Sequence, residues 1–87
     1  MHAIFDAKFK KMYAKVSKKI KIAFNNRLDL FLIDRRHPLL DDHALSGKYL
    51  GYRSINITGN FRAIYTEVSK NIFRFVAIGT HPQLYGK

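Results

Sequence analysis

The side chains in this sequence that are suited to acid–base chemistry are its histidines. There are four, His2, His37, His43 and His81, and the chain contains no cysteine. Because histidine has an unperturbed pKa of about 6.5, it can donate or accept a proton near neutral pH. His81 lies in a Gly-Thr-His-Pro segment and His43 in Asp-His-Ala-Leu. From position alone, an exposed loop histidine is the favoured interpretation of His81, and His43 fits a loop residue and a functional one equally well. His37 before proline favours a capping role, and His2 is simply terminal.

Arginine and aromatic side chains concentrate in residues 51–65, Gly-Tyr-Arg-Ser-Ile-Asn-Ile-Thr-Gly-Asn-Phe-Arg-Ala-Ile-Tyr. Polar and apolar residues alternate on both sides of Thr-Gly-Asn, which predicts two strands joined by a tight turn. The hairpin carries Arg53 and Arg62 together with Phe61. Guanidinium groups bind phosphates, and aromatic rings stack on bases. This composition favours a nucleic-acid-binding sheet, although an arginine on a strand is usually just a solvated side chain.

Charge is the strongest global signal in the sequence. Sixteen Lys and Arg face six Asp and Glu, which gives a formal net charge of +10 on 87 residues. Such a field favours a polyanion, an acidic membrane or an acidic protein partner over a merely solvated surface. The absence of cysteine excludes a disulfide framework, a zinc ribbon and a thiol nucleophile. Asp41-Asp42 is the only carboxylate pair, so a two-metal nuclease site is not expected.

Hydrophobic periodicity predicts a single α+β domain over residues 1–87. A short strand is expected at 3–5, followed by a helix at 7–16 behind an Asp6 N-cap and a helix at 18–34 behind a Ser17 N-cap. Strands are expected at 49–57, 60–67 and 72–78, followed by a polar tail. The two helices pack on one face of a mainly antiparallel sheet, and the other face is expected to stay open. No apolar run approaches the ~20 residues that span a bilayer, and lysines from Lys8 onward interrupt any signal-peptide core.

The second half of the chain resembles the RelE/ParE toxin superfamily, in particular its YafQ-type RelE/StbE branch. The resemblance lies in Asp-His-Ala-Leu-Ser-Gly at 42–47, Gly-Tyr-Arg at 51–53, Arg-Ala-Ile-Tyr at 62–65, Phe75, and Gly-Thr-His-Pro-Gln-Leu-Tyr-Gly at 79–86. Their order and spacing hold over about residues 40–86, and the strand–helix–helix–sheet layout extends the likeness to the whole chain. No single motif is specific, but the ordered set in a small basic chain is.

The resemblance implies a RelE-like fold and the toxin of a bacterial type II toxin–antitoxin system. Such a toxin is a cytoplasmic, metal-independent and cofactor-free endoribonuclease that cuts mRNA on the ribosome and inhibits translation. Its matching positions assign His81 as general acid and His43 as base or phosphate ligand. They place Arg62 against the scissile phosphate, and they make Tyr85 a base-stacking or proton-transfer residue.

Several further residues are expected to bind RNA, although four positions depart from the YafQ pattern, among them Phe61, which stands where the branch has a tryptophan. The expected RNA-binding residues are Phe61, Arg53, Asn56, Asn60 and Lys48. Ser54 and Asn56 stand where that branch has an aspartate and a histidine, and Asn60 replaces an aspartate. Asparagine cannot accept a proton as those groups do. The identity of the base therefore remains open between His43 and Tyr85.

The expected partners are a cognate antitoxin, mRNA and the ribosome, whose 16S rRNA the lysine-rich helices would contact. The free toxin is expected to be a monomer that forms a hetero-oligomer with its antitoxin. Two alternatives remain. One is a ParE-like poison of DNA gyrase on the same fold, which has no need for paired histidines, and the other is a catalytically weak module that binds RNA or antitoxin.

Overall fold

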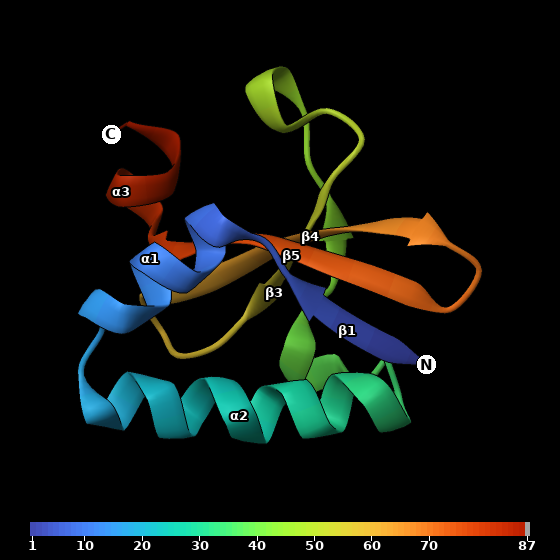
Figure 1. Ribbon diagram of the computed structural model, residues 1–87, viewed down its shortest axis with the longest axis horizontal. Coiled ribbons are helices and arrows are strands. Elements are labelled where there is room, and N and C mark those ends of the chain that lie inside the picture. The colour runs from blue at the N-terminus through green and yellow to red at the C-terminus, as the bar shows by residue number, and fades with distance from the viewer. Residues whose placement is uncertain (87) are drawn as a thin grey trace.

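Five strands form one sheet in the computed structural model, which describes residues 1–86 (Figure 1). Their order is β1-β5-β4-β3-β2. β1 runs parallel to β5, and the other neighbouring strands are antiparallel. The strands are β1 (His2–Phe5), β2 (His43–Ala44), β3 (Arg53–Asn56), β4 (Phe61–Ser69) and β5 (Ile72–Thr80). The predicted α+β class with a mainly antiparallel sheet is confirmed.

Two helices follow the first strand, as predicted. α1 (Ala7–Lys15) begins at Asp6, whose carboxylate accepts a hydrogen bond from the Phe9 N–H at 2.8 Å. α2 (Lys18–Ile33) begins at Ser17, whose hydroxyl accepts from the Ile20 N–H at 3.2 Å. Side-chain acceptors of this kind satisfy N–H groups that the first helical turn leaves unpaired. Both caps were predicted, and each helix ends within one residue of the expected position. No helix within residues 1–86 is long and apolar enough to cross a membrane.

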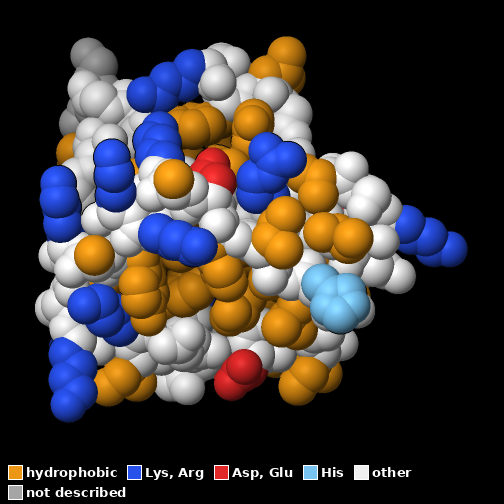
Figure 2. Space-filling model, in the orientation of Figure 1, with side chains coloured by type: hydrophobic (Ala, Val, Ile, Leu, Met, Phe, Trp, Pro, Cys, Tyr) orange, Lys and Arg blue, Asp and Glu red, His pale blue; other side chains and the backbone are white. Residues whose placement is uncertain are grey.

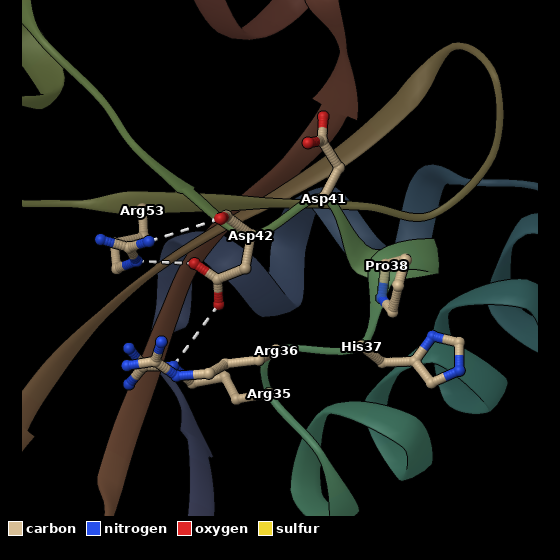
Figure 3. Close-up of a pocket in the computed structure, with 7 residues that line it drawn as sticks. All are labelled: Arg35, Arg36, His37, Pro38, Asp41, Asp42 and Arg53. Atoms are coloured by element: carbon tan, nitrogen blue, oxygen red, sulfur yellow. Dashed lines mark hydrogen bonds and ion pairs between the residues drawn. The ribbon is translucent and has the colours of Figure 1, made fainter.

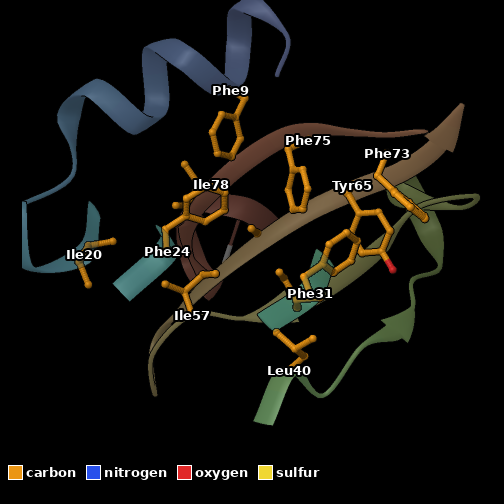
Figure 4. Close-up of a cluster of buried hydrophobic side chains, with 12 residues drawn as sticks. Phe9, Ile20, Phe24, Phe31, Leu40, Ile57, Tyr65, Phe73, Phe75 and Ile78 are labelled. Carbon is orange, nitrogen blue, oxygen red and sulfur yellow. The ribbon is translucent and has the colours of Figure 1, made fainter. Parts of the chain in front are cut away.

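Aromatic rings hold the helices on the sheet (Figure 4). Alternation along β5 turns Phe73 and Phe75 toward the helices, where both are buried. Phe31 of α2 lies with its ring edge-on to both, at centroid distances of 5.2 and 5.5 Å, and 4.9 Å from Tyr65 on β4. Edge-to-face contacts of this kind add stability beyond the area that they bury. This cluster makes the sheet a rigid platform for the side chains on its other face.

The second face of the sheet is not fully open, which corrects the prediction of an open face and a polar tail. The chain ends in a short helix, α3 (His81–Tyr85), whose Leu84 is buried against Ile64 and Ala77. Thr80 and Gln83 form a capping box at its start. A capping box satisfies two backbone N–H groups reciprocally, so it stabilises a helix of only five residues.

The connection before β3 also differs from the expected strand at 49–57. Residues Gly47–Tyr49 form a 3-10 helix, η2, and the strand begins only at Arg53. Gly47 and Gly51 flank this turn at φ values of 63° and 91°, in the left-handed region that glycine adopts most easily. β4 continues to Ser69, two residues beyond the expected end, so the hairpin turn is reduced to residues 70–71, and β5 begins as expected but continues to Thr80.

His37 has the capping role predicted for it, although at a different helix. Its Nδ1 accepts a hydrogen bond of 3.1 Å from the Leu39 N–H and caps the 3-10 helix η1 (Pro38–Leu40). The buried Leu40 anchors this helix in the core. The segment that leads to His43 is therefore held at both of its ends, by α2 and by β2.

Candidate active site

One cleft, of about 270 Å³, brings together the four residues that were predicted to be catalytic. It is lined by His43, Leu45, Ser46, Ser54, Arg62, His81 and Tyr85. These residues come from β2, the loop after it, β3, β4 and α3. They are separated by up to 42 positions in the sequence (43 to 85), so only the fold places them side by side.

The strand register explains why these side chains share a face. His43 on β2 lies opposite Ser54 on β3, and Asn56 on β3 lies opposite Arg62 on β4. Directly opposed residues project to the same side of a sheet, as do residues two apart on one strand. The four therefore project from the face that α3 partly covers, and Ile55, between Ser54 and Asn56, points into the core under the helices.

The last helix adds His81 and Tyr85 to this cleft. The two residues are four positions apart on α3, and their ring centroids lie 4.5 Å apart. Side chains with this spacing lie on the same side of a helix. The Tyr85 ring also meets Tyr49 at 5.7 Å in a nearly perpendicular contact. Tyr85 is thus held between His81 and Tyr49 at the wall of the cleft.

Close contact between β5 and α3 sets the position of His81 and leads to a first prediction. The Gln83 side-chain oxygen accepts from the Thr80 N–H at 2.8 Å, and a Cβ at position 79 would lie 2.9 Å from that oxygen. We expect Gly79→Ala to displace Gln83 and cost about 1 kcal/mol, the usual value for a lost cap, or about 4–8 °C in Tm. Thermal unfolding measures this loss. Gly59→Ala is the control, because nothing lies within 4 Å of a Cβ there, and an equal loss in both variants would contradict the close-contact argument.

His43 is oriented by a hydrogen bond to the loop that carries it. Its Nδ1 lies 2.7 Å from the backbone oxygen of Asp41. A carbonyl oxygen only accepts hydrogen bonds, so Nδ1 carries a hydrogen, and in the neutral ring Nε2 is the nitrogen that can accept a proton. Asp41 adopts the left-handed conformation, with φ 46°, and that turn directs its carbonyl to the ring. The side chain of His43 remains 49% exposed, so a substrate has access to it.

Arg62 is held at the edge of the cleft by the turn between β3 and β4. Its Nη1 donates to the backbone oxygens of Thr58 at 2.9 Å, Phe61 at 3.1 Å and Gly59 at 3.2 Å. One nitrogen with two hydrogens serves all three acceptors. The positive charge of the guanidinium is not neutralised by these neutral groups, so it stays available to a phosphate.

Two polar atoms on the cleft face have no hydrogen-bond partner among the described residues. They are the Ser54 hydroxyl and the Asn56 side-chain oxygen, and both atoms are buried. A buried polar group without a partner costs about 1–3 kcal/mol. Ser54 is 1% exposed and lines the cleft. Both residues depart from the pattern of the toxin family that the sequence resembles. That difference in residue type does not by itself indicate that the two side-chain atoms lack hydrogen-bond partners.

Removing the unpaired hydroxyl should therefore stabilise the free protein. We expect Ser54→Ala to raise the free energy of unfolding by about 1 kcal/mol, because alanine buries no polar group at this position. Chemical denaturation monitored by circular dichroism measures the change. Ser69→Ala at an exposed position of β4 is the control and should change stability by less than about 0.5 kcal/mol. A loss of stability in Ser54→Ala would mean that the hydroxyl is already satisfied.

Two of the residues expected to bind RNA, Arg53 and Phe61, are not in this cleft. Arg53 projects from the opposite face of β3, where its Nε donates to the Asp42 carboxylate at 2.6 Å. Phe61 packs toward the helices and lines a hollow with Met12, Ile20 and Ile78. The hairpin composition was read correctly as two strands, but strand alternation sends these side chains away from His43 and His81.

The other three do not line the cleft either: Asn56 projects from the cleft face of β3, and Lys48 and Asn60 are exposed. The Lys48 ammonium lies 5.3 Å from the ring centroid of Tyr49, which in turn contacts Tyr85. Asn60 lies in the turn that holds Arg62, and its N–H donates to the Thr58 hydroxyl at 3.3 Å.

Asp42 is the centre of a second, larger hollow of about 550 Å³ (Figure 3). Its carboxylate accepts from Arg53 and from the Tyr65 hydroxyl, and it lies 3.6 Å from the Arg35 Nε. Burial and the hydrogen bond to Asp42 raise the pKa of the Tyr65 hydroxyl, so it remains a donor. The hydrogen bond that Arg53 donates to Asp42 also raises the pKa of Arg53. These charges satisfy one another, and the cluster holds the segment that carries His43.

Within residues 1–86 no group of three or more His, Asp or Glu side chains is arranged to hold a metal ion.

Positive charge spreads over the helical side of the molecule. Figure 2 shows many Lys and Arg side chains and few acidic ones on the face that carries α1 and α2, with apolar side chains exposed between them. The lysines of these helices are Lys8, Lys10, Lys11, Lys15, Lys18, Lys19 and Lys21. This charge attracts polyanions over several ångströms and is screened by salt.

Comparison with known proteins identifies the family. A family model described as the bacterial toxin of type II toxin–antitoxin systems, YafQ, matches residues 1–86. The crystal structure of YafQ from E. coli strain BL21(DE3) is similar, with a TM-score of 0.73 and 25% identity over 97% of both chains. The YafQ chain of the E. coli DinJ–YafQ toxin–antitoxin complex has a TM-score of 0.70 and 26% identity over 97% of this chain and 96% of that one.

A solved structure of lower sequence identity shares the fold. The YoeB/ParE toxin from Agrobacterium tumefaciens has a TM-score of 0.75 at 18% identity, over 93% of this chain and 99% of that one. Among curated protein sequences no match was found. The predicted superfamily, its YafQ branch and the RelE-like fold are thus confirmed.

Proposed function

The chain belongs to the YafQ family of type II toxin–antitoxin toxins, and on this premise we propose that it is an endoribonuclease that cuts mRNA on the ribosome without a metal ion. The observation that carries the proposal is the meeting of His43, Arg62, His81 and Tyr85 in one cleft. Two histidines and an arginine are the groups that RNA cleavage by acid–base chemistry requires. A toxin of this kind inhibits translation.

In this mechanism the 2′-hydroxyl of the RNA is the nucleophile. His43 Nε2 takes its proton, and the 2′-oxygen attacks the neighbouring phosphorus. Arg62 donates hydrogen bonds to the phosphate oxygens as negative charge develops in the phosphorane. His81 gives a proton to the 5′-oxygen as its bond to phosphorus breaks. The products are a 2′,3′-cyclic phosphate and a 5′-hydroxyl. At the end of the reaction His43 holds one proton more, and His81 one proton fewer, than at the start.

Tyr85 orients the substrate in this proposal. Its ring is fixed by His81 and Tyr49, so a base that stacks on it is placed beside His81. Stacking on an aromatic side chain contributes about 1–3 kcal/mol per base. Lys48 and Asn60 at the margin of the cleft add polar contacts to the RNA, whereas Asn56 on the cleft face acts on the RNA through Arg62 opposite it. Arg53 is left out of this set, because its guanidinium is bound to Asp42 on the other face.

The partners follow from the family and from charge. The DinJ–YafQ and YoeB–YefM structures are toxin–antitoxin complexes, so a toxin with this fold has an antitoxin partner. We propose that the present chain is a monomer when free and forms a hetero-oligomer with an acidic or amphipathic antitoxin segment. The lysines of α1 and α2 are proposed to contact 16S rRNA, which places the protein in the cytoplasm with the ribosome.

Primer extension on a defined mRNA tests the proposed function. Purified protein is added to the same mRNA either free or bound in programmed ribosomes. We expect discrete cuts in the codon at the ribosomal A site and little or no cleavage of free mRNA. Toxicity in cells without any ribosomal cleavage would contradict the proposal and would direct attention to DNA gyrase, whose supercoiling activity can be assayed with the same preparation.

A further inference from the structure

Asn56 has an acceptor atom that the free protein does not use. Its side-chain oxygen is buried, and no donor among residues 1–86 reaches it. Nearly all buried polar atoms in folded proteins are paired, so each unpaired one calls for an explanation. The residue lies on the cleft face of β3, directly opposite Arg62 on β4.

Arg62 has unused donors next to this unused acceptor. All three of its hydrogen bonds come from Nη1 and go to backbone oxygens of the β3–β4 turn. Its Nε and Nη2 make no hydrogen bond within the described part of the chain. Side chains of opposed residues start about 4.5–5.5 Å apart at Cβ, so an arginine easily reaches the carboxamide across the strands.

We propose that Arg62 has a second position, in which Nε–H donates to the Asn56 oxygen and the two Nη groups face the scissile phosphate. Asn56 is then a positioning residue for the catalytic arginine. This inference rests on the proposed function and deepens it. The exchange gives up three hydrogen bonds that share two hydrogens. In return it gains one bond to Asn56 and a bidentate, charge-assisted contact with the phosphate.

An asparagine suits this role better than an acid. Its oxygen accepts a hydrogen bond without neutralising the guanidinium, so the full positive charge remains for the phosphorane. An aspartate at the same position would pair with Arg62 and reduce the charge that it presents. The role also explains how the chain functions with asparagine where related toxins have histidine: the residue directs the arginine and moves no proton.

A double-mutant cycle tests the coupling. We expect Asn56→Leu to leave the protein at least as stable, because it removes an unpaired buried acceptor, and to lower kcat roughly tenfold with little change in KM. In an Arg62→Ala background the same substitution should have no further effect on kcat. Asn26→Leu on α2 is the matched control and should leave kcat unchanged. An equal tenfold loss with and without Arg62 would overturn the inference.

A second readout does not depend on cleavage. The side-chain N–H signal of Arg62 Nε, assigned by its loss in Arg62→Lys, is followed by NMR during titration with a 2′-O-methylated RNA oligonucleotide that cannot be cut. We expect a shift to lower field and slower hydrogen exchange in the wild type, and neither change in Asn56→Leu. If the wild type proves not to be a nuclease, this signal still reports the second position. An unchanged Nε signal at saturation, or the same change in both proteins, would overturn it.

Discussion

Replacing His81 by alanine should lower the rate of mRNA cleavage on programmed ribosomes by about 10²–10⁴-fold, the usual contribution of a general acid or base. The 5′-oxygen is a poor leaving group without a proton, and His81 is the histidine that α3 brings to the Tyr85 side of the cleft. Single-turnover cleavage at saturating toxin measures the chemical step. His2→Ala removes a histidine at the exposed start of β1 and should leave the rate unchanged.

The folded state and the antitoxin complex of His81→Ala should be preserved. His81 is exposed at the first turn of α3 and is not part of the core. Its thermal unfolding and its affinity for the antitoxin are therefore expected to match those of the wild type. If the variant keeps a cleavage rate within a few-fold of the wild type, His81 is not the acid and the assignment is wrong.

Asp42→Ala should have the largest effect on stability of any single substitution near the site. The Asp42 side chain is 7% exposed and faces Arg53, Arg35 and the Tyr65 hydroxyl. Removing the carboxylate leaves the buried Tyr65 hydroxyl without its acceptor, which costs about 1–3 kcal/mol, and the partly exposed Arg35 and Arg53 lose their counter-charge. For a domain of this size each kcal/mol lowers Tm by about 4–8 °C. Urea denaturation and thermal unfolding both measure it.

Two comparisons make this result specific. Asp29→Ala removes an exposed carboxylate from α2 and should change stability by less than about 0.5 kcal/mol. Asp42→Asn keeps an acceptor for the Tyr65 hydroxyl and should lose less than Asp42→Ala. A loss below about 1 kcal/mol in Asp42→Ala would show that the cluster does not hold the segment before His43.

The parts of the fold that the sequence predicts well depend on local signals. Asp6 and Ser17 stand immediately before amphipathic runs, and both are N-caps. The period-2 alternation around Thr-Gly-Asn identifies the β3–β4 hairpin, since it depends only on neighbouring residues. α3 was missed although Thr80 and Gln83 have the spacing of a capping box. A five-residue helix has no periodicity to detect, and its stability comes from burying Leu84.

The candidate site could be predicted only in part. The identities of His43, Arg62, His81 and Tyr85 follow from the resemblance to a toxin family, and the fold brings them together. Whether a strand residue faces the cleft depends on register, and Phe61 and Arg53 face the other way. The contact of Arg62 with the turn and the pairing around Asp42 depend on side-chain geometry across distant segments, which no local pattern contains.

The most direct test of the account is a comparison of two mRNAs in programmed ribosomes, identical except for a 2′-deoxynucleotide on the 5′ side of the expected cut. The account predicts that the all-ribonucleotide mRNA is cut to a 2′,3′-cyclic phosphate and a 5′-hydroxyl, and that the 2′-deoxy mRNA is not cut at that bond, because His43 then has no 2′-hydroxyl to deprotonate. Cleavage of the 2′-deoxy mRNA at the same bond, or 5′-phosphate ends on the products, would contradict the proposed chemistry of the cleft.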